Sequence, residues 1–516
     1  MIGKDRIQEI LREKRPAFEL IVLCLAALLL GLLFIKNLMF FLLFCVAVAG
    51  LALFLWLSSV RKETLLTFAL MIMLWLGFLH APFTSGNYVF WLQELLILAC
   101  LSVMMMRRGK HTRPAFWPIL IPYGIVCFMT LVPTLNNESL VTYLNGVRRI
   151  AIAPLLFILG QLLAQERSSR TAFRVFLWTF VLQLPACLIL IYWHTGSFFQ
   201  LPGADLLTGT FGRGGTGYIV IFMSAVLGIS VWLFAKRQLS LKILALLSGI
   251  FLVLGRWSDL KFIYLLLPLT LGVAFLLVVR QRSSSRKWKA LVAELAGLTI
   301  LFVVLLLVIS ASSVRFHSGT LAISSMFNPD YIRQALFVDS KGIVTSNEGR
   351  EFSRYGVLVY ALNFISRDFV TRAAGHGLGS TATEGALGET KLGQMVGIRN
   401  IDYSTLSVLL FETGIGGTLL YLAPFCILMA SAFFSLRKKK VLGTDLEILS
   451  GMVVLYGFCL LASLPYNGFA VTPRGGGVFW LLGGLWYAAR RKAFSKAEGL
   501  PHDTDEQGVQ HAPPKS

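Results

Sequence analysis

A set of charged side chains, mostly arginines, lies between the apolar blocks of this sequence and could bind phosphate. A guanidinium group presents paired N–H donors that match two phosphate oxygens, so several arginines together suit a diphosphate. The excess positive charge has to be balanced by an anion. The alternative to a bound diphosphate is pairing with lipid phosphates or with nearby carboxylates. The set comprises Arg148, Arg149, Arg213, Arg256, Asp259, Lys261, Arg350, Arg354, Arg372 and Arg474.

Two short motifs give members of this set a local context. In FGRGGTG, Arg213 stands between glycines just before an apolar block. Glycine lets backbone amides approach a ligand, and a helix N-terminus adds positive potential, although a flexible loop between two helices would have a similar sequence. In GRWSDLKF, Asp259 and Lys261 precede another apolar block. Ionisable groups where a membrane span begins usually line a cavity or form a structural ion pair.

The elements that must position these residues are membrane-spanning helices. The mean hydropathy of +0.72, with 56% hydrophobic and 14% charged residues, is too apolar for a soluble domain of 516 residues. The apolar residues form blocks of about 17 to 25 residues, the length of a transmembrane helix. We therefore predict an all-α polytopic integral membrane protein of about 12 to 14 transmembrane helices. The candidate spans begin near residues 18, 38, 64, 88, 115, 148, 174, 217, 240, 262, 290, 404, 447 and 477.

Two of these candidate spans are short. The ninth carries Lys242, and the fourteenth extends only from about Gly477 to Ala489, so either could be re-entrant. The first apolar block has no small-residue cleavage site after it, and we expect no cleaved signal peptide.

The distribution of basic residues predicts the orientation of the chain. Most of the 47 Lys and Arg residues fall in every second loop, as expected if cationic loops stay in the cytoplasm. This pattern explains most of the net charge of +21 without any nucleic acid. The predicted segments are a cytoplasmic N-terminus (1–17), transmembrane helices (18–310), a large extracytoplasmic loop (311–401), further transmembrane helices (402–489) and a cytoplasmic, disordered tail (490–516).

The cysteines and histidines give no sign of a metal site or cofactor. All seven cysteines fall inside apolar blocks, where cysteine behaves as a small hydrophobic residue. No cluster of Cys, His and carboxylates has the spacing of metal ligands, so we expect neither a disulfide framework nor a metal.

The loop 311–401 is too long for a structureless connection and predicts a functional segment. Within it, the segment Glu351 to Phe369 has apolar residues near helical period, which predicts an amphipathic helix on the membrane surface or capping the bundle. The apolar positions are Phe352, Tyr355, Val359, Leu362 and Ile365.

Three stretches, NEGREFSRYG, AGHGLGS and IDYSTLSVLLFETGIGGTLLYL, resemble the O-antigen ligase and polysaccharide polymerase superfamily of bacterial envelope glycosyltransferases. In that superfamily a large outer loop precedes a late helix, GR opens an amphipathic helix, a G-x-G-x-G-like turn follows, and a segment ending E-x-G-x-x-G re-enters the membrane. The similarity is strongest over residues 345–422 and weaker around Arg213. The corresponding residues are Gly349, Arg350, Gly375, Gly377, Gly379, Glu412, Gly414 and Gly417.

The resemblance implies a metal-independent membrane glycosyltransferase without a cofactor. Such enzymes transfer a glycan from undecaprenyl diphosphate to an acceptor hydroxyl at the outer face of the bacterial cytoplasmic (inner) membrane, in exopolysaccharide or O-antigen biosynthesis. Arg350 and Arg213 would bind the diphosphate and stabilise its developing charge. Arg354, Lys261 and Arg148 are the further predicted ligands of the lipid diphosphate.

The chain departs from the ligase pattern at the segment that returns to the membrane. Ligases of the superfamily carry a His-Asn pair there, whereas this chain has Asn400, Ile401, Asp402 and Tyr403. The difference favours a polymerase over a ligase. Asp402 is the candidate general base, with helix N-capping as the alternative. His376, in the glycine-rich turn, is the other candidate, with a solvated loop residue as the alternative.

A second function class fits the same topology, namely a multi-pass transporter or a lipid-linked oligosaccharide flippase. Transporters usually have related halves and short loops, whereas this chain has one dominant late loop and no repeat that we detect, which favours the enzyme. The expected partners are an undecaprenyl-diphosphate-linked glycan, membrane lipids and a chain-length regulator or export protein. No nucleic acid is expected.

Overall fold

The computed structural model of the protein describes residues 56, 59–80, 88–107, 114–195, 208–211, 216–257, 262–281, 343–346, 349–352, 354–366, 368–381, 390–396, 404–436 and 444–497. The predicted spans near residues 18, 38 and 290 lie outside these ranges.

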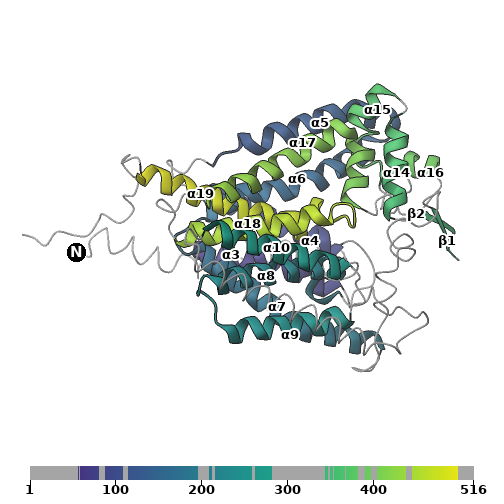
Figure 1. Ribbon diagram of the computed structural model, residues 1–516. Helices are drawn as coiled ribbons and strands as arrows, with labels where there is room; N and C mark the ends of the chain where they lie inside the picture. Colours follow the sequence, from purple (N-terminus) through teal and green to yellow (C-terminus); the bar gives the residue numbers. More distant parts are fainter. Residues whose placement is uncertain are drawn as a thin grey trace, which may run out of the picture.

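Helices make up most of the described residues, and the long ones run side by side along one axis (Figure 1). Among these residues six helices are long and apolar enough to cross a membrane. The prediction of an all-α polytopic membrane protein is therefore confirmed. The six are α5 (Trp117–Asn137), α6 (Leu140–Leu163), α7 (Ser168–Thr195), α8 (Thr216–Ala235), α17 (Thr405–Ser435) and α18 (Thr444–Ser463).

Five further helices begin close to predicted span starts. The two short candidates are both helical, with 17 residues in α9 and 20 in α19. A π-helical turn, η5 (Pro473–Gly477), leads directly into α19, so the helical segment is longer than the sequence suggested. The five are α3 (Lys62–Trp75), α4 (Tyr88–Met106), α9 (Leu241–Trp257), α10 (Phe262–Gln281) and α19 (Val478–Ala497).

The two ends of the bundle differ. At one end, which we call the loop end, lie the elements formed within residues 343–396 (Figure 1). They are β1 (Ile343–Ser346), β2 (Gly349–Phe352), α14 (Arg354–Ile365), α15 (Phe369–Ala374) and α16 (Lys391–Val396). The described part of the chain also contains three 3-10 turns: η1 (Leu76–His80), η3 (Gly209–Phe211) and η4 (Phe469–Val471).

At the opposite end, which we call the basic end, basic residues flank described helices such as α7 and α8. There Lys236, after α8, forms an ion pair with Glu447 in the first turn of α18. Ser169, at the start of α7, donates a hydrogen bond to Asp445 in the same turn of α18. The basic segments that precede α7 and follow α8 thus lie at the same end of the bundle, beside the start of α18.

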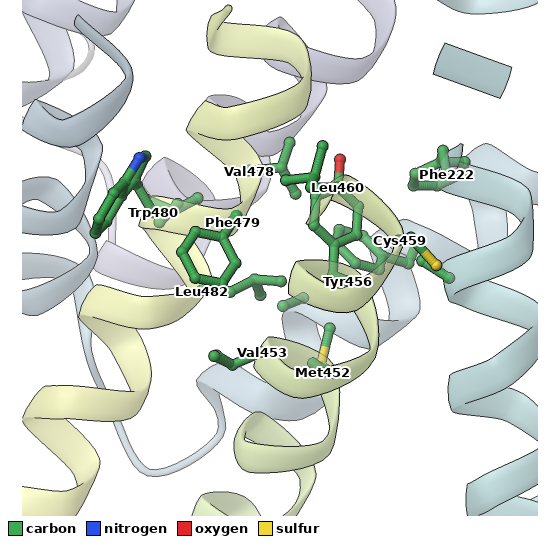
Figure 2. Close-up of a cluster of buried hydrophobic side chains, with 14 of the residues drawn as sticks. Phe222, Met452, Val453, Tyr456, Cys459, Leu460, Val478, Phe479, Trp480 and Leu482 are labelled. Atoms are coloured by element: carbon green, nitrogen blue, oxygen red, sulfur yellow. The ribbon is translucent and has the colours of Figure 1, made fainter. Parts of the chain in front are cut away.

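Close helix packing holds the centre of the bundle together. Helices α6 and α19 approach so closely that a Cβ on Gly160 would lie 2.3 Å from the Leu481 carbonyl oxygen, and one on Gly484 would lie 2.1 Å from that of Phe157. Small residues permit such contact between membrane helices. Beside this seam, Tyr456 of α18, Phe479 of α19 and Phe222 of α8 belong to one buried apolar cluster (Figure 2).

The predicted amphipathic helix is present but shorter than the segment Glu351 to Phe369. Glu351 and Phe352 belong to β2, which pairs antiparallel with β1, and α15 begins at Phe369. In α14 the buried face is formed by Val357, Ala361 and Ile365, packed against Leu410 and Phe411 of α17.

Of the apolar face predicted for this helix, Ile365 is buried, whereas Val359 and Leu362 are exposed. Helix α14 is apolar on more than one side, so periodicity alone does not identify the side that packs on α17. The exposed side adds to an apolar surface at the loop end.

Candidate functional site

An ion pair at the loop end joins three segments that are far apart in the sequence. Arg149 of α6 donates a hydrogen bond to Oε1 of Glu412, a fully buried residue of α17. The same oxygen accepts hydrogen bonds from the Thr381 hydroxyl at 2.6 Å and from the Thr381 amide at 3.2 Å. Charged groups inside a membrane protein are costly to bury and are typically paired and functional. This cluster therefore marks a candidate site.

The glycine-rich turn is bonded directly to α17 beside this ion pair. The His376 amide donates to the Phe411 carbonyl at 2.7 Å, and the Gly377 amide donates to the Glu412 carbonyl at 3.0 Å. Helix α17 is kinked at Gly414, whose φ of +64° is in the left-handed region. Such a φ favours glycine, because other residues are strained there. The G-x-G-x-G and E-x-G-x-x-G motifs thus form one packed unit.

His376 is half-buried in this unit. Its ring packs against Phe364 of α14, with the ring centroids 4.8 Å apart. The imidazole therefore packs on α14, while the His376 backbone is bonded to α17.

Asp368 caps α15, the short helix that directly precedes the glycine-rich turn. It is the N-cap residue of α15, and its carboxylate accepts hydrogen bonds from the Thr371 amide at 2.7 Å and the Thr371 hydroxyl at 2.6 Å. The hydrogen bond from the Thr371 hydroxyl, followed by the one from its amide, holds the pKa of Asp368 below the ordinary value of 3.8.

Two neighbouring residues of α4 hold two more arginines at the loop end. Glu94 forms an ion pair with Arg148 of α6 at 2.8 Å, and Gln93 accepts a hydrogen bond from Nε of Arg474 at 3.3 Å. Arg474 is buried and also donates to the Phe211 carbonyl. Gln93 itself donates to the carbonyl groups of Ile72 and Met73 in α3. These cations are thus fixed in place by the scaffold.

The residues at the two ends of the FGRGGTG motif are held in place by contacts with neighbouring helices. The Phe211 and Tyr218 rings stack with centroids 5.8 Å apart, and the Tyr218 hydroxyl lies 2.7 Å from that of Thr472. Before Phe211, the Thr210 amide and hydroxyl are bonded to the buried carboxamide of Gln183 in α7. The ends of the motif are therefore anchored to α7, α8 and η5.

Asn467 connects the start of α8 with the start of α17. Its carbonyl oxygen accepts hydrogen bonds from the Thr405 amide at 2.7 Å and the Thr405 hydroxyl at 2.9 Å. Its side-chain Nδ2 lies 3.2 Å from the place where a Cβ on Gly217 would stand. The Asn467 carboxamide is buried, and within the described residues neither its nitrogen nor its oxygen has a hydrogen-bond partner. A buried amide of this kind can donate to one ligand atom and accept from another.

The structure brings together only part of the predicted site. Arg148 and His376 both lie in the loop-end cluster described above. Arg350 is in β2, opposite Thr345 of β1, and Arg354 is the first residue of α14. Arg350 therefore lies in a β-hairpin that precedes the helix and does not open the helix itself.

The other three predicted residues, Arg213, Lys261 and Asp402, lie outside the described residues. Their neighbours are informative, however. Helix α17 is capped by Ser404, which forms a reciprocal capping box with Ser407. Because Ser404 occupies the N-cap position, the alternative that Asp402 caps α17 is excluded.

Sequence reasoning missed three contributors to this cluster. Glu94 and Asn467 are isolated polar residues in or beside apolar segments, with no motif around them, and Thr381 follows the AGHGLGS stretch but is not one of its glycines. For Glu94 alone a signal existed, since an acidic residue within an apolar block usually has a partner. Among the described residues no group of three His, Cys, Asp or Glu could hold a metal ion.

The chain matches no protein-family model, and no curated protein matches it in sequence.

Proposed function

We propose that the chain is a membrane glycosyltransferase that polymerises or ligates undecaprenyl-diphosphate-linked oligosaccharide units, with its active site at the loop end. The observation that carries the proposal is the position of Asn467. It joins the start of α8, which follows Arg213 in the sequence, to the start of α17, which follows Asp402. The helices that follow the expected diphosphate-binding segment and the expected base in the sequence therefore begin beside one buried amide, which has no hydrogen-bond partner among the described residues.

The proposed reaction is a displacement at the anomeric carbon of the lipid-linked glycan. The oxygen of an acceptor hydroxyl forms a bond to this carbon, and the bond from the carbon to the diphosphate oxygen breaks. The proton of the acceptor hydroxyl passes to a base, for which Asp402 is the first candidate and His376 the second. The lipid diphosphate leaves with the bonding electrons, and Arg213 and Arg350 stabilise its added charge.

The pairing of Arg148 and Arg149 with carboxylates assigns them a supporting part in this proposal. Glu94 and Glu412 already balance their charges, so they hold the scaffold around the site, and either carboxylate would compete with a phosphate for its arginine. The cations that remain for the diphosphate are Arg213, Arg350, Arg354 and Lys261.

The proposal places the loop end outside the cytoplasmic membrane of a bacterium and both chain termini in the cytoplasm. The basic end carries most of the cationic connections between the described helices, and cationic loops remain in the cytoplasm during insertion. Lipid-linked glycan and a chain-length regulator or export protein are the proposed partners on the loop-end side.

The test of the assigned arginines is replacement of Arg350 by alanine in cells that make the polymer. We expect chain lengthening to be lost while the amount of inserted protein stays unchanged. Arg372→Ala is the matched control, because Arg372 is an exposed arginine of the same loop whose guanidinium donates only to the Ser366 carbonyl among the described residues. Full-length polymer from Arg350→Ala would remove Arg350 from the site.

The reaction class is tested by the lipid-linked intermediates that accumulate in a strain lacking the chain. Single repeat units on the outer face of the membrane are expected for a polymerase, and complete chains still attached to lipid diphosphate are expected for a ligase. Accumulation of lipid-linked repeat units on the cytoplasmic face would contradict the enzyme hypothesis and support the flippase.

A further inference from the structure

A pocket at the basic end is lined by three arginines at and just before the start of α7, at the opposite end of the bundle from the site proposed above. The pocket has a volume of about 280 Å³ and is formed between the first turns of α3 and α7. Its lining residues are Glu63, Arg167, Arg170, Thr171 and Arg174.

The three arginines line the pocket together. Arg170 and Arg174 are four residues apart in α7, which places their side chains on one face of the helix, and Arg167 directly precedes its first residue, Ser168. All three are exposed, and within the described residues none of their guanidinium groups has an ion pair or a hydrogen bond. Like charges at this spacing repel one another.

The helix itself adds to this repulsion. Arg170 and Arg174 lie in the first two turns of α7 and Arg167 directly precedes the helix, where the unsatisfied amides of the helix N-terminus already give a positive potential. Cations are favoured at the other end of a helix. Glu63 supplies the one carboxylate of the pocket, so the lining keeps an excess of positive charge. An anion is needed to balance it.

A general bias toward basic cytoplasmic loops accounts for the end of the bundle at which these residues lie. It does not require three of them to share one pocket. The pocket lies where two helices of a membrane protein begin, which is the level of the lipid phosphates. Basic pockets between transmembrane helices on the cytoplasmic side are suited to anionic lipid headgroups.

We propose that this pocket binds the headgroup of an anionic phospholipid. The arginines donate paired hydrogen bonds to the phosphodiester oxygens, and the Thr171 hydroxyl and the Glu63 carboxylate lie within the same pocket to contact the hydroxyl groups of a glycerol headgroup. The excess positive charge favours phosphatidylglycerol over zwitterionic phosphatidylethanolamine.

The test is native mass spectrometry of the purified full chain in detergent, titrated with phosphatidylglycerol or phosphatidylethanolamine. The variant Arg170→Gln/Arg174→Gln should weaken phosphatidylglycerol binding by about tenfold or more, since each basic group near a membrane surface contributes on the order of fivefold. The control Lys242→Gln/Lys492→Gln removes the same charge from exposed lysines that do not line the pocket, and should change binding less than about twofold.

A variant that should strengthen lipid binding gives a second measurement. Glu63→Gln removes the one carboxylate and should strengthen phosphatidylglycerol binding by up to about fivefold. Equal weakening in both double variants, or equal binding of phosphatidylethanolamine, would overturn the proposal. So would displacement of the lipid by millimolar glycerol phosphate, because the ligand would then be a soluble phosphate.

Discussion

Arg149 and Glu412 form an ion pair although they lie 263 residues apart in the sequence. Thr381 donates two hydrogen bonds to the carboxylate oxygen that accepts from Arg149, so one oxygen holds α6, α17 and the glycine-rich turn together. The Glu412 side chain is 1% exposed and that of Arg149 is 26% exposed. Since the carboxylate has almost no access to water, its charge depends on these donors.

Loss of either charge of this pair should destabilise the protein. Glu412→Gln leaves Arg149 without a charged partner, and we expect a loss of up to about 3 kcal/mol in the free energy of unfolding. Thermal unfolding in detergent measures the effect. The double variant Arg149→Met/Glu412→Gln should lose less than the sum of the two single variants.

The pair Lys236 and Glu447 at the basic end is the control. Its carboxylate side chain is 29% exposed, so water compensates for part of the lost attraction. We expect Glu447→Gln to cost about 1 kcal/mol or less. Equal losses in the free energy of unfolding for Glu412→Gln and Glu447→Gln would show that burial of Glu412 does not strengthen its ion pair.

Alanine at Gly377 should disrupt the glycine-rich turn. Gly377 has φ +101°, and a Cβ there would lie 2.1 Å from the Thr134 hydroxyl oxygen of α5. Backbone strain alone is worth about 1 to 3 kcal/mol, and the clash adds to it. We expect a clear fall in the thermal unfolding midpoint together with reduced polymer formation.

Gly124→Ala is the matched control for this substitution. Gly124 is a helical residue of α5 with no other atom within 4 Å of an added Cβ. Because alanine is favoured over glycine in a helix by about 0.5 to 1 kcal/mol, this variant should be as stable as the parent or slightly more so. A midpoint for Gly377→Ala that matches that of Gly124→Ala would contradict the geometry of the turn.

The fold class followed from hydropathy because each membrane helix can be recognised from its own stretch of sequence. Blocks of about 20 apolar residues predict spans one at a time, and starts such as those near residues 217 and 404 agree with α8 and α17. The packing face of α14 did not follow, because its sides are similarly apolar. Val357 and Ala361 are buried, whereas Val359 and Leu362 are not, and that choice depends on Leu410 and Phe411 of the distant α17.

The site was predictable only in those parts that carry glycines or unusual charges. The motifs around Gly377 and Gly414 have glycine at positive φ, a requirement visible in the sequence as spacing. Arg149 and Glu412 were noted separately, but no rule of sequence pairs residues so far apart. Asn467 carries no local signal at all, since its importance depends on Thr405 and Gly217 meeting around it.

The cap of α15 should respond to pH through Asp368. Because the pKa of Asp368 in the folded chain lies below its ordinary value of 3.8, the charged carboxylate is favoured by folding. Its stabilising effect is complete above the pKa of the unfolded chain and is lost as pH falls through the folded pKa, in a window below 3.8. Hydrogen exchange of residues 368–376, corrected for intrinsic rates, should show protection decreasing in that window.

Asp368→Asn is the control for that titration. Asparagine is also a good N-cap residue, but it does not titrate. The variant should therefore keep protection at neutral pH and show no further loss on acidification. If acid removes protection equally from both proteins, another group controls α15.

Replacement of Asn467 by leucine should separate stability from activity. The Asn467 carboxamide is buried without a hydrogen-bond partner among the described residues, and removing an unsatisfied polar group can be neutral or stabilising. If the amide binds substrate, Asn467→Leu should keep or raise the thermal unfolding midpoint while polymer formation falls by about tenfold or more, the loss expected for one hydrogen bond to a charged group. Ser224→Ala is the matched control, since Ser224 of α8 is also buried with its hydroxyl unpartnered in the described part of the chain. That variant should gain or keep stability with full activity, because Ser224 is not part of the loop-end cluster. Normal polymer length from Asn467→Leu would assign Asn467 to the scaffold alone, and the two segments that it joins would then have to bind substrate without it.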